Sequence, residues 1–361
     1  MRITILLNHN NRSWIIEKMA ERLARELVLL GCEATVSGSI DPSSDLVHHM
    51  SWAFANSPTT QPSTMMITHL DDHFKFMQIK TTLETNVAVG ICMSNDTRQQ
   101  LILRGSPASQ LVAIGPAHDG AMSPRRIVIG LTTRLYPDGR KGEHLLVGLA
   151  STFDLSAFEF RIFGKGWDHV IPILERAGAA VVYAGESDDF QADYQAIQRA
   201  VPLFDYYLYL GMDEGSLGTL DALMAGVKTI VTPQGFHLDL PHGITHAVTS
   251  VEDLKQVFTE IARPMQQRRD GVSGLTWAHY ARQHLLLWQT LLNGHPASQA
   301  PIGPPAIGED QSRALAKLES VRDQTLSRNS FHPRRMLSAL SHLPLLQGLR
   351  KILDKLLRKK C

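Results

Sequence analysis

The sequence lacks the features that mark secreted, zinc-binding or membrane-spanning proteins. It has three cysteines, Cys32, Cys92 and Cys361, which are too few for a disulfide framework and include no CxxC pair. This scarcity favours a reducing compartment and argues against structural zinc. No uncharged apolar run reaches 18 residues, so we expect no segment to span a membrane. The first expected strand starts at Arg2 with no signal-peptide pattern before it, so we expect no signal peptide.

An excess of charge of one sign is also missing. The formal net charge is +1, so we do not expect a general nucleic-acid binder. Apolar residues make up 43% of the chain and charged residues 20%, both ordinary for a soluble globular protein. With 361 residues the chain can bury a large core, and it is expected to hold two domains. We expect a cytoplasmic protein.

Short apolar strands alternate with helical segments, a pattern typical of a parallel, doubly wound α/β sheet. In the first half we expect strands at 2–7, 33–37, 45–49, 64–69, 88–93 and 111–114, and helices at 14–30, 74–83 and 96–103. In the second half we expect strands at 127–131, 158–163, 180–183, 206–210 and 228–232, and helices at 141–150, 168–177, 188–200, 216–225 and 251–261. The fold class is therefore expected to be α/β.

Proline and glycine punctuate the chain where domains are expected to end. The segment 115–124 has no periodicity and is expected to link a domain at 1–118 to one at 125–275. A helix over 276–293 is long enough to lie across both halves. Residues 298–361 are expected to form a linker and a basic amphipathic helical tail. The apolar and cationic residues of 336–361 suit an anionic membrane surface, or alternatively a docking face for another protein.

One stretch, 205–236, predicts a ligand site by itself. It reads as a strand, an acidic loop, a short helix and a second strand. Glu214 and Asp221 are seven residues apart, about two helical turns, so both side chains could face one crevice. The amides of Gly215, Ser216 and Leu217 open the helix, and unpaired amides at a helix start bind anions. Carboxylates can bind sugar hydroxyls, and the amides at a helix start can bind phosphates. Together they indicate a site for a sugar nucleotide.

The second half resembles the C-terminal domain of the group-1 family of retaining glycosyltransferases. The segments that carry this resemblance are 130–135 with 141–142, 160–166, 214–226 and 231–232. The resemblance implies a GT-B fold, with two Rossmann-like doubly wound domains facing across a cleft. It also implies a transferase that moves a sugar from a nucleotide-sugar donor to a glycan or a lipid-linked glycan. The family needs no bound metal or other cofactor, and we expect none here.

The resemblance assigns roles to residues of the second half. Arg134 and Lys141 would hold the donor diphosphate, since two fixed cations neutralise the leaving group. Glu214 would be catalytic and hold donor sugar hydroxyls, and Asp221 would reach the ribose. The remaining donor-binding candidates are the phosphate-cradle residues and two turn glycines, namely Gly215, Ser216, Leu217, Gly164 and Gly166.

The first half is expected to supply the acceptor side. His69 falls where a family histidine lies near the sugar, and it is the second catalytic candidate. Polar residues at expected strand ends give four acceptor-side candidates, Asn10, Arg12, His48 and Asp71. His48, its neighbour His49 and His237 could instead be structural residues, since a lone histidine more often is.

The sequence departs from the family pattern and leaves alternatives open. Six residues separate Glu214 from Asp221, where the family usually has seven, and Arg140 competes with Lys141 for the cationic role. One alternative is a catalytically inactive GT-B-like protein that binds a sugar nucleotide or a partner. Another is an inverting enzyme or a sugar-nucleotide epimerase with the same cleft.

Overall fold

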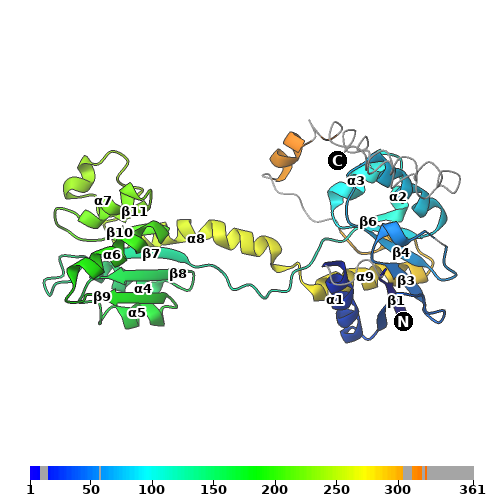
Figure 1. Cartoon of the computed structure of the whole chain (residues 1–361), viewed down its shortest axis with the longest axis horizontal. Helices are drawn as coiled ribbons and strands as arrows, with labels where there is room; N and C mark the ends of the chain where they lie inside the picture. The colour runs from blue at the N-terminus through cyan, green and yellow to red at the C-terminus, as the bar shows by residue number, and fades with distance from the viewer. Residues whose placement is uncertain (9–14, 57, 304–310, 319–321, 323–361) are drawn as a thin grey trace, which may run out of the picture. The chain divides into compact units, whose positions relative to one another are not determined.

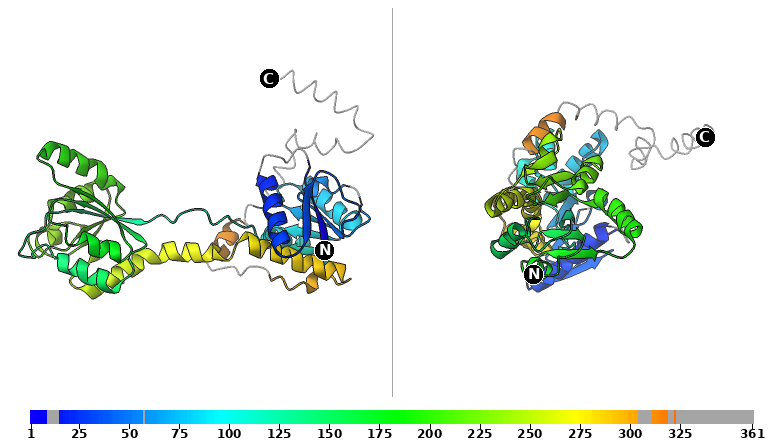
Figure 2. Two further views of the ribbon diagram at one scale, coloured as in Figure 1. Left: turned by 90° about the horizontal axis from the view of Figure 1, so that it is seen from below. Right: turned by 90° about the vertical axis from the view of Figure 1, so that its left-hand side faces the viewer.

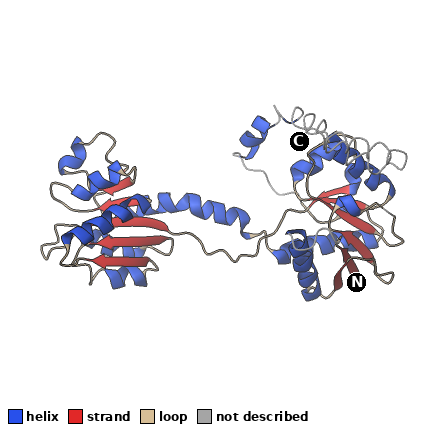
Figure 3. Cartoon of the chain, viewed as in Figure 1, coloured by secondary structure: helices blue, strands red, loops and turns tan. Residues whose placement is uncertain are grey.

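The computed structural model describes residues 1–8, 15–56, 58–303, 311–318 and 322. The chain divides into two compact units (Figure 1). Unit 1 holds the chain up to Gly120 and again from Gly274, and unit 2 is Ala121–Ser273. Each unit has a sheet with helices on both of its faces (Figure 3). The tail predicted over 336–361 lies outside the described residues.

Unit 1 contains a parallel six-stranded sheet in the order β2-β1-β3-β4-β5-β6. Its strands are β1 (Arg2–Leu6), β2 (Glu33–Ser37), β3 (Leu46–His49), β4 (Ser63–Ile67), β5 (Val89–Cys92) and β6 (Leu111–Ala113). Its helices are α1 (Ile15–Leu29), α2 (His73–Thr85), α3 (Asn95–Leu103) and α9 (Trp277–Leu292). The central strands β3, β4 and β5 are buried along their whole length, as strands covered on both faces must be.

Unit 2 contains a second parallel six-stranded sheet, in the order β12-β11-β10-β7-β8-β9. Its strands are β7 (Ile127–Thr132), β8 (Phe158–Phe163), β9 (Ala180–Gly185), β10 (Tyr206–Tyr209), β11 (Lys228–Val231) and β12 (His246–Ala247). Its helices are α4 (Glu143–Thr152), α5 (Ile171–Arg176), α6 (Phe190–Ala200), α7 (Leu217–Met224) and α8 (Val251–Ser273). The two Rossmann-like domains expected for the GT-B class are therefore present.

The strand order of unit 2 reverses at β7. The chain moves outward from β7 to β8 and β9, then returns to β10 on the other side of β7. At such a switch point the loops after the two strands diverge to opposite faces, and doubly wound sheets bind ligands in the crevice between them. The carboxyl ends of β7 and β10 are therefore where a ligand site is expected.

Helix α8 is longer than the sequence predicted. It was expected to end at 261, but it continues as one helix to Ser273 with Pro264 inside it (Figure 2). A proline removes one backbone hydrogen bond from a helix. The residues after it favour helix, and Gln266 Nε2 donates to Asp270 Oδ1 at 2.7 Å, one turn away.

Helix α9 is the element that was expected to lie across both halves, and it belongs to unit 1. Its buried face includes Tyr280, His284 and Trp288, which join the core around β1 and α1. Trp288 Nε1 donates to Thr64 Oγ1 on β4 at 3.2 Å. No helix among the described residues has the length and apolar character that a membrane crossing needs.

Candidate functional site

The loop after β7 is held in a conformation that glycines make possible. Gly142 has φ +70°, and a Cβ there would lie 2.1 Å from the carbonyl oxygen of Leu210. Gly164, after β8, has φ +105°, and a Cβ there would lie 2.7 Å from the carbonyl oxygen of Thr133. Both positions therefore need glycine. Trp167 Nε1 donates to the same Thr133 oxygen at 2.8 Å and fixes the start of the loop.

The side chain of Lys141 crosses from this loop to the end of β10. Its Nζ donates to Tyr209 Oη at 2.9 Å and to Asp213 Oδ2 at 2.6 Å. Tyr209 Oη in turn donates to the other carboxylate oxygen of Asp213. Because β7 and β10 are neighbours at the switch point, these three side chains tie together the two loops that flank it.

The electrostatics of this triad keep Asp213 ionised. Partial burial alone would raise the pKa of Asp213, but hydrogen bonds from Lys141, Tyr209 and the Gly215 amide hold that pKa below its ordinary value. Burial and the adjacent carboxylate raise the pKa of Tyr209, so the phenol stays protonated and remains a donor. The result is a fixed Lys141–Asp213 ion pair.

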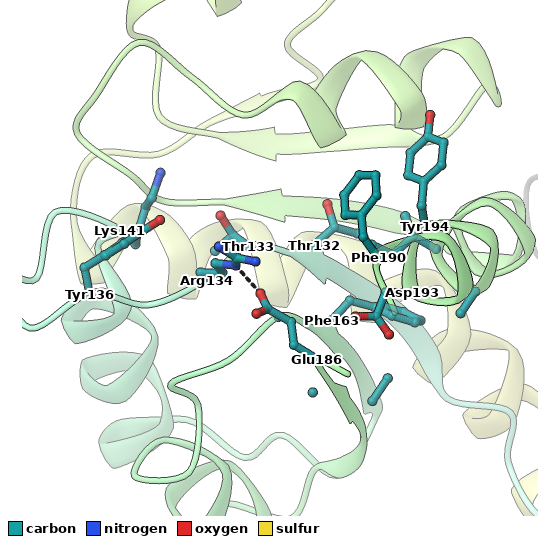
Figure 4. Close-up of a pocket in the computed structure, with 15 residues that line it drawn as sticks. Thr132, Thr133, Arg134, Tyr136, Lys141, Phe163, Glu186, Phe190, Asp193 and Tyr194 are labelled. Atoms are coloured by element: carbon teal, nitrogen blue, oxygen red, sulfur yellow. Dashed lines mark hydrogen bonds and ion pairs between the residues drawn. The ribbon is translucent and has the colours of Figure 1, made fainter. Parts of the chain in front are cut away.

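Arg134 lies at the end of β7 and forms an ion pair with Glu186, which follows β9. Arg134, Lys141 and Gly164 line one cavity of about 440 Å³ together with Glu186. Figure 4 shows Arg134 and Lys141 on the cationic side of this cavity. The structure therefore brings together both predicted phosphate-binding cations. Arg140, the competing cation, is not among the lining residues; its guanidinium lies 4.1 Å from the Tyr136 ring.

The opposite side of the same cavity is aromatic. Phe190 and Tyr194, one turn apart on α6, have rings 6.0 Å apart and tilted by only 5° (Figure 4). Phe190 is 71% exposed, which is unusual for a side chain of that size. Below them Asp193 accepts hydrogen bonds from the amide and hydroxyl of Ser187, which fixes the loop before α6. A cavity with cations on one side and flat rings on the other suits a nucleotide.

The loop between β10 and α7 is built around His237. Gly215 has φ +107°, and a Cβ there would meet the rings of Phe236 and His237. His237 is buried and its Nδ1 donates to the carbonyl of Thr232 at 3.0 Å. Its Nε2 therefore accepts, from the Ser216 amide at 3.3 Å and the Thr219 hydroxyl at 3.0 Å.

These contacts correct the expectation that three unpaired amides open α7. The Gly215 amide donates to Asp213 Oδ1 at 3.3 Å, and the Ser216 amide donates to His237. The Ser216 hydroxyl caps the helix at the Gly218 amide and also bonds the hydroxyl of Tyr207 at 2.8 Å. Leu217 begins the helix with an exposed side chain.

The two predicted acids of 205–236, Glu214 and Asp221, are not among the residues that line the cavity. Glu214 is exposed, and its carbonyl accepts a hydrogen bond from the Phe236 amide at 3.1 Å. Asp221 lies half-buried on α7. Gly166 has φ +91° and packs on Leu135, so it too shapes the loop from outside the cavity.

In unit 1, a small polar cluster lies after β4. His69 accepts a hydrogen bond from Lys75 Nζ at its Nε2 (2.9 Å), and its Nδ1 bonds Thr68 Oγ1 at 2.7 Å. Lys75 Nζ also donates to Asp71 Oδ1 at 2.5 Å. The catalytic candidate His69 and the acceptor-side candidate Asp71 are thus joined by Lys75, and Asp72 caps α2 beside them.

His48 is a core residue rather than an acceptor-side one. It has no exposed surface, and its Nδ1 lies 2.9 Å from Thr64 Oγ1. Its ring contacts those of His284 and Trp288 on α9, each 5.4 Å away. Of the two expectations for His48, an acceptor-side residue or a structural one, its burial beneath α9 supports the structural one. Asn10 and Arg12 lie outside the described residues.

Several residues of the site were not found from the sequence. Asp213 directly precedes Glu214, and Glu186 follows a strand, so both carried a signal as acids at strand ends. Tyr209 read as an ordinary strand residue, and Phe190 as an ordinary helix residue. Lys75, one turn into α2, gave no signal. Among the described residues, no cluster of three or more histidine, cysteine or acidic side chains could hold a metal ion.

Comparisons with known proteins give similarity at low identity. No family model and no curated protein matches the chain. Among solved structures, the lipopolysaccharide outer core galactosyltransferase WaaB in its apo form is 13% identical, with a TM-score of 0.31, over 78% of this chain and 97% of that one. HepE from Anabaena in complex with UDP-glucose is 14% identical, with a TM-score of 0.31, over 89% of this chain and 100% of that one.

A glycosyltransferase from Rickettsia africae is 12% identical, with a TM-score of 0.33, over 81% of this chain and 98% of that one. TM-scores near 0.3 do not by themselves establish a relationship, so the assignment of function rests on the residues described above.

Proposed function

We propose that the chain is a retaining glycosyltransferase that moves a sugar from a nucleotide-sugar donor to a glycan or lipid-linked glycan. One observation carries the proposal: Arg134 and Lys141 line a single cavity at the end of β7, with Phe190 and Tyr194 across from them. The cations suit a diphosphate and the rings suit a planar base.

In the proposed reaction, the bond between the anomeric carbon and the donor phosphate oxygen breaks. A bond from the acceptor hydroxyl oxygen to that carbon forms on the same face, and the hydroxyl proton passes to the departing phosphate oxygen. Negative charge grows on the diphosphate, so Arg134 and Lys141 stabilise the transition state more than the bound donor. Both cations already have fixed positions, because Glu186 and Asp213 hold them.

The remaining roles are those that the family resemblance implies. Glu214 lies exposed beside the ion-paired Asp213 and is proposed to hold donor sugar hydroxyls, with Asp221 on α7 reaching the ribose. Gly215, Ser216 and Leu217 shape the start of that helix. His69 and Asp71, at the end of β4, are proposed for the acceptor side.

The test is donor turnover by the purified chain. UDP-, GDP- and ADP-sugars are screened by thermal shift, because a ligand of the folded state raises its stability. The stabilising donor is then incubated with glycan acceptors, and the anomeric configuration of the product is read by NMR. Glu214→Gln should lower turnover about 100-fold, while Glu252→Gln, a change at another acid of unit 2 distant in sequence, should leave it intact. Product of inverted configuration would overturn retention.

A second candidate is a protein that binds a sugar nucleotide without turnover. The ion pairs of Arg134 with Glu186 and of Lys141 with Asp213 favour it, because a diphosphate has to displace both acids from the cations. Thermal stabilisation by a donor, with no nucleoside diphosphate released by either the wild type or Glu214→Gln, would select it.

The tail is proposed to hold the enzyme on an anionic membrane at its cytoplasmic face, near a lipid-linked acceptor. Its sequence over 336–361 is rich in leucine, lysine and arginine. Removal of 336–361 should abolish flotation with anionic vesicles. Unchanged flotation would remove this part of the proposal.

A further inference from the structure

Unit 2 has a second cavity at the other edge of its sheet. It is about 640 Å³ in volume and lies at the amino ends of three neighbouring strands, where Ile127, Tyr206 and Lys228 are the first residues. The second half of α8 forms another wall. Since all strands of this sheet are parallel, this cavity and the one at the carboxyl end of β7 open at opposite edges.

The second cavity is lined by five cations and one acid. Arg125 and Arg126 come from the segment before β7, Lys228 from the start of β11, and Arg268 and Arg269 from α8. The acid, Asp205, already has hydrogen-bond partners at both carboxylate oxygens. Arg125 Nη2 donates to both of its oxygens at 2.6 and 2.8 Å, and the Val128 amide donates to one of them at 2.9 Å.

The other four cations have no ion pair within the described part of the chain. The acid next to them on α8, Asp270, accepts a hydrogen bond from Gln266. Four cations without an ion pair among the described residues therefore line one cavity of a chain whose formal net charge is only +1, which makes this cavity locally positive.

The walls between the cations are apolar. Among the apolar lining residues, Phe204 and Val227 are buried, 6% and 7% exposed, and Met265 of α8 is half-buried. The ring of Tyr206 lies 5.6 Å from Lys228 Nζ. A ligand here meets guanidinium and ammonium groups together with hydrocarbon, so an anion with an apolar portion fits better than a simple ion.

We propose that this cavity binds a phosphate ester that carries an apolar group. Guanidinium groups bind phosphate oxygens in pairs, and the clustered charge suits a doubly charged phosphate monoester. The concave shape admits one ligand molecule and does not suit a nucleic-acid duplex, which needs an extended basic surface. The site does not depend on the proposed transferase activity, because its residues lie at the opposite edge of the sheet from Arg134 and Lys141.

The test is calorimetric titration of the full chain with octyl phosphate and with inorganic phosphate. Octyl phosphate should bind with one-to-one stoichiometry, more tightly than inorganic phosphate. The double charge reversal Arg268→Glu with Arg269→Glu should weaken its binding at least about ten-fold, because two attractive contacts become repulsive. The milder Lys228→Gln should weaken it about three-fold. Both changes are at exposed positions, and thermal melting checks that each variant folds.

Arg263→Glu is the matched control, since Arg263 is an exposed arginine of the same helix and does not line the cavity. Its affinity for octyl phosphate should remain within about two-fold of wild type. An equal loss in the control, undiminished affinity in the double variant, or no binding to wild type would overturn the proposal. Equal affinity for inorganic phosphate would overturn its apolar part.

Vesicles then separate the two sources of such a ligand. The full chain and the double variant, with identical tails, are sedimented with phosphatidylcholine vesicles that contain phosphatidic acid. If the wild type sediments with these vesicles and the double variant does not, the site is assigned to a lipid phosphate. Binding of octyl phosphate without a difference in pelleting assigns it to a soluble phosphate ester.

Discussion

The Nζ atom of Lys141 lies 2.6 Å from Oδ2 of Asp213, and this ion pair joins the loop after β7 to the loop after β10. The two side chains are 14% and 27% exposed, and Tyr209 bonds both. The pair therefore bridges the two loops at the switch point of unit 2. A diphosphate that binds Lys141 has to compete with a carboxylate already fixed beside it.

The first prediction concerns the strength of this pair. In a double-mutant cycle with Lys141→Met and Asp213→Asn, the coupling free energy of unfolding should be about 1–2 kcal/mol, because both partners are largely shielded from water. The control is the cycle for Arg140 and Asp138, an exposed pair at 3.7 Å, whose coupling should stay below about 0.5 kcal/mol. Urea unfolding measures both. Equal couplings would contradict a special role for Lys141.

This coupling should also depend on pH. The pKa of Asp213 is lower in the folded chain than its ordinary value, so the folded state binds fewer protons than the unfolded state as the carboxyl titrates. Its contribution to stability is full above the ordinary pKa of 3.8 and is lost as pH falls through the lower, folded pKa. The cycle should therefore give the same coupling at pH 7 and at pH 5, both above 3.8, and a smaller coupling at a pH well below 3.8.

The second prediction separates Lys141 from its neighbour as the diphosphate ligand. Lys141→Ala should weaken binding of the nucleoside diphosphate about ten-fold or more, since a charged contact within the cavity is removed. Arg140→Ala should change the affinity less than about three-fold, because Arg140 stacks on Tyr136 and does not line the cavity. Calorimetric titration with the diphosphate of the donor found by thermal shift measures both. The reverse order would transfer the role to Arg140.

The third prediction tests the backbone of the same loop. Gly139 and Gly142 both have positive φ, +68° and +70°, so alanine at either costs about 1 kcal/mol of strain. A Cβ at Gly142 would lie 2.1 Å from the Leu210 carbonyl oxygen, whereas at Gly139 the nearest atom is 3.8 Å away. Gly142→Ala should therefore lower the unfolding free energy by at least about 2 kcal/mol more than Gly139→Ala. Similar losses in the two variants would show that the loop can move away from β10.

The architecture could be predicted from the sequence because strand ends are marked locally. The apolar run of β7 stops at Thr132 and that of β10 stops at Tyr209, and polar residues follow each. Parallel strands place those loops at one edge, which is how Arg134, Lys141 and the acidic loop were found. The two-residue strand β12 was missed because His246–Ala247 has no apolar run.

Partners between the loops could not be predicted in the same way. Lys141 pairs with Asp213, not Glu214, and only the path of the loop decides between adjacent acids. The Ser216 amide is bonded by His237, which lies 21 residues further along the chain. Such contacts depend on how the loops after β10 and β11 pack together, and neither periodicity nor spacing contains that information.

The last prediction concerns three buried histidines in unit 1. His48, His49 and His284 are at most 3% exposed, and desolvation lowers the pKa of each, to about 4 for His49 and His284. The ring of His284 also lies 4.3 Å from the ring of Tyr280, which burial keeps protonated and neutral. Within the described ranges of the chain, no acidic side chain raises the pKa of any of the three histidines.

An unfolded histidine binds a proton near pH 6.5, so the unfolded state binds more protons than the folded state below that pH. The unfolding free energy of unit 1 should therefore fall as pH falls from 6.5 toward 4, by about 1–2 kcal/mol per histidine between pH 7 and 5. His284→Phe removes one of the three groups and should reduce this pH dependence by roughly a third, whereas His279→Gln, at an exposed position of α9, should not change it. Urea unfolding of each variant at pH 7 and pH 5 gives the comparison. An unchanged pH dependence in His284→Phe would mean that water reaches the histidines and lets them titrate as they do in the unfolded chain.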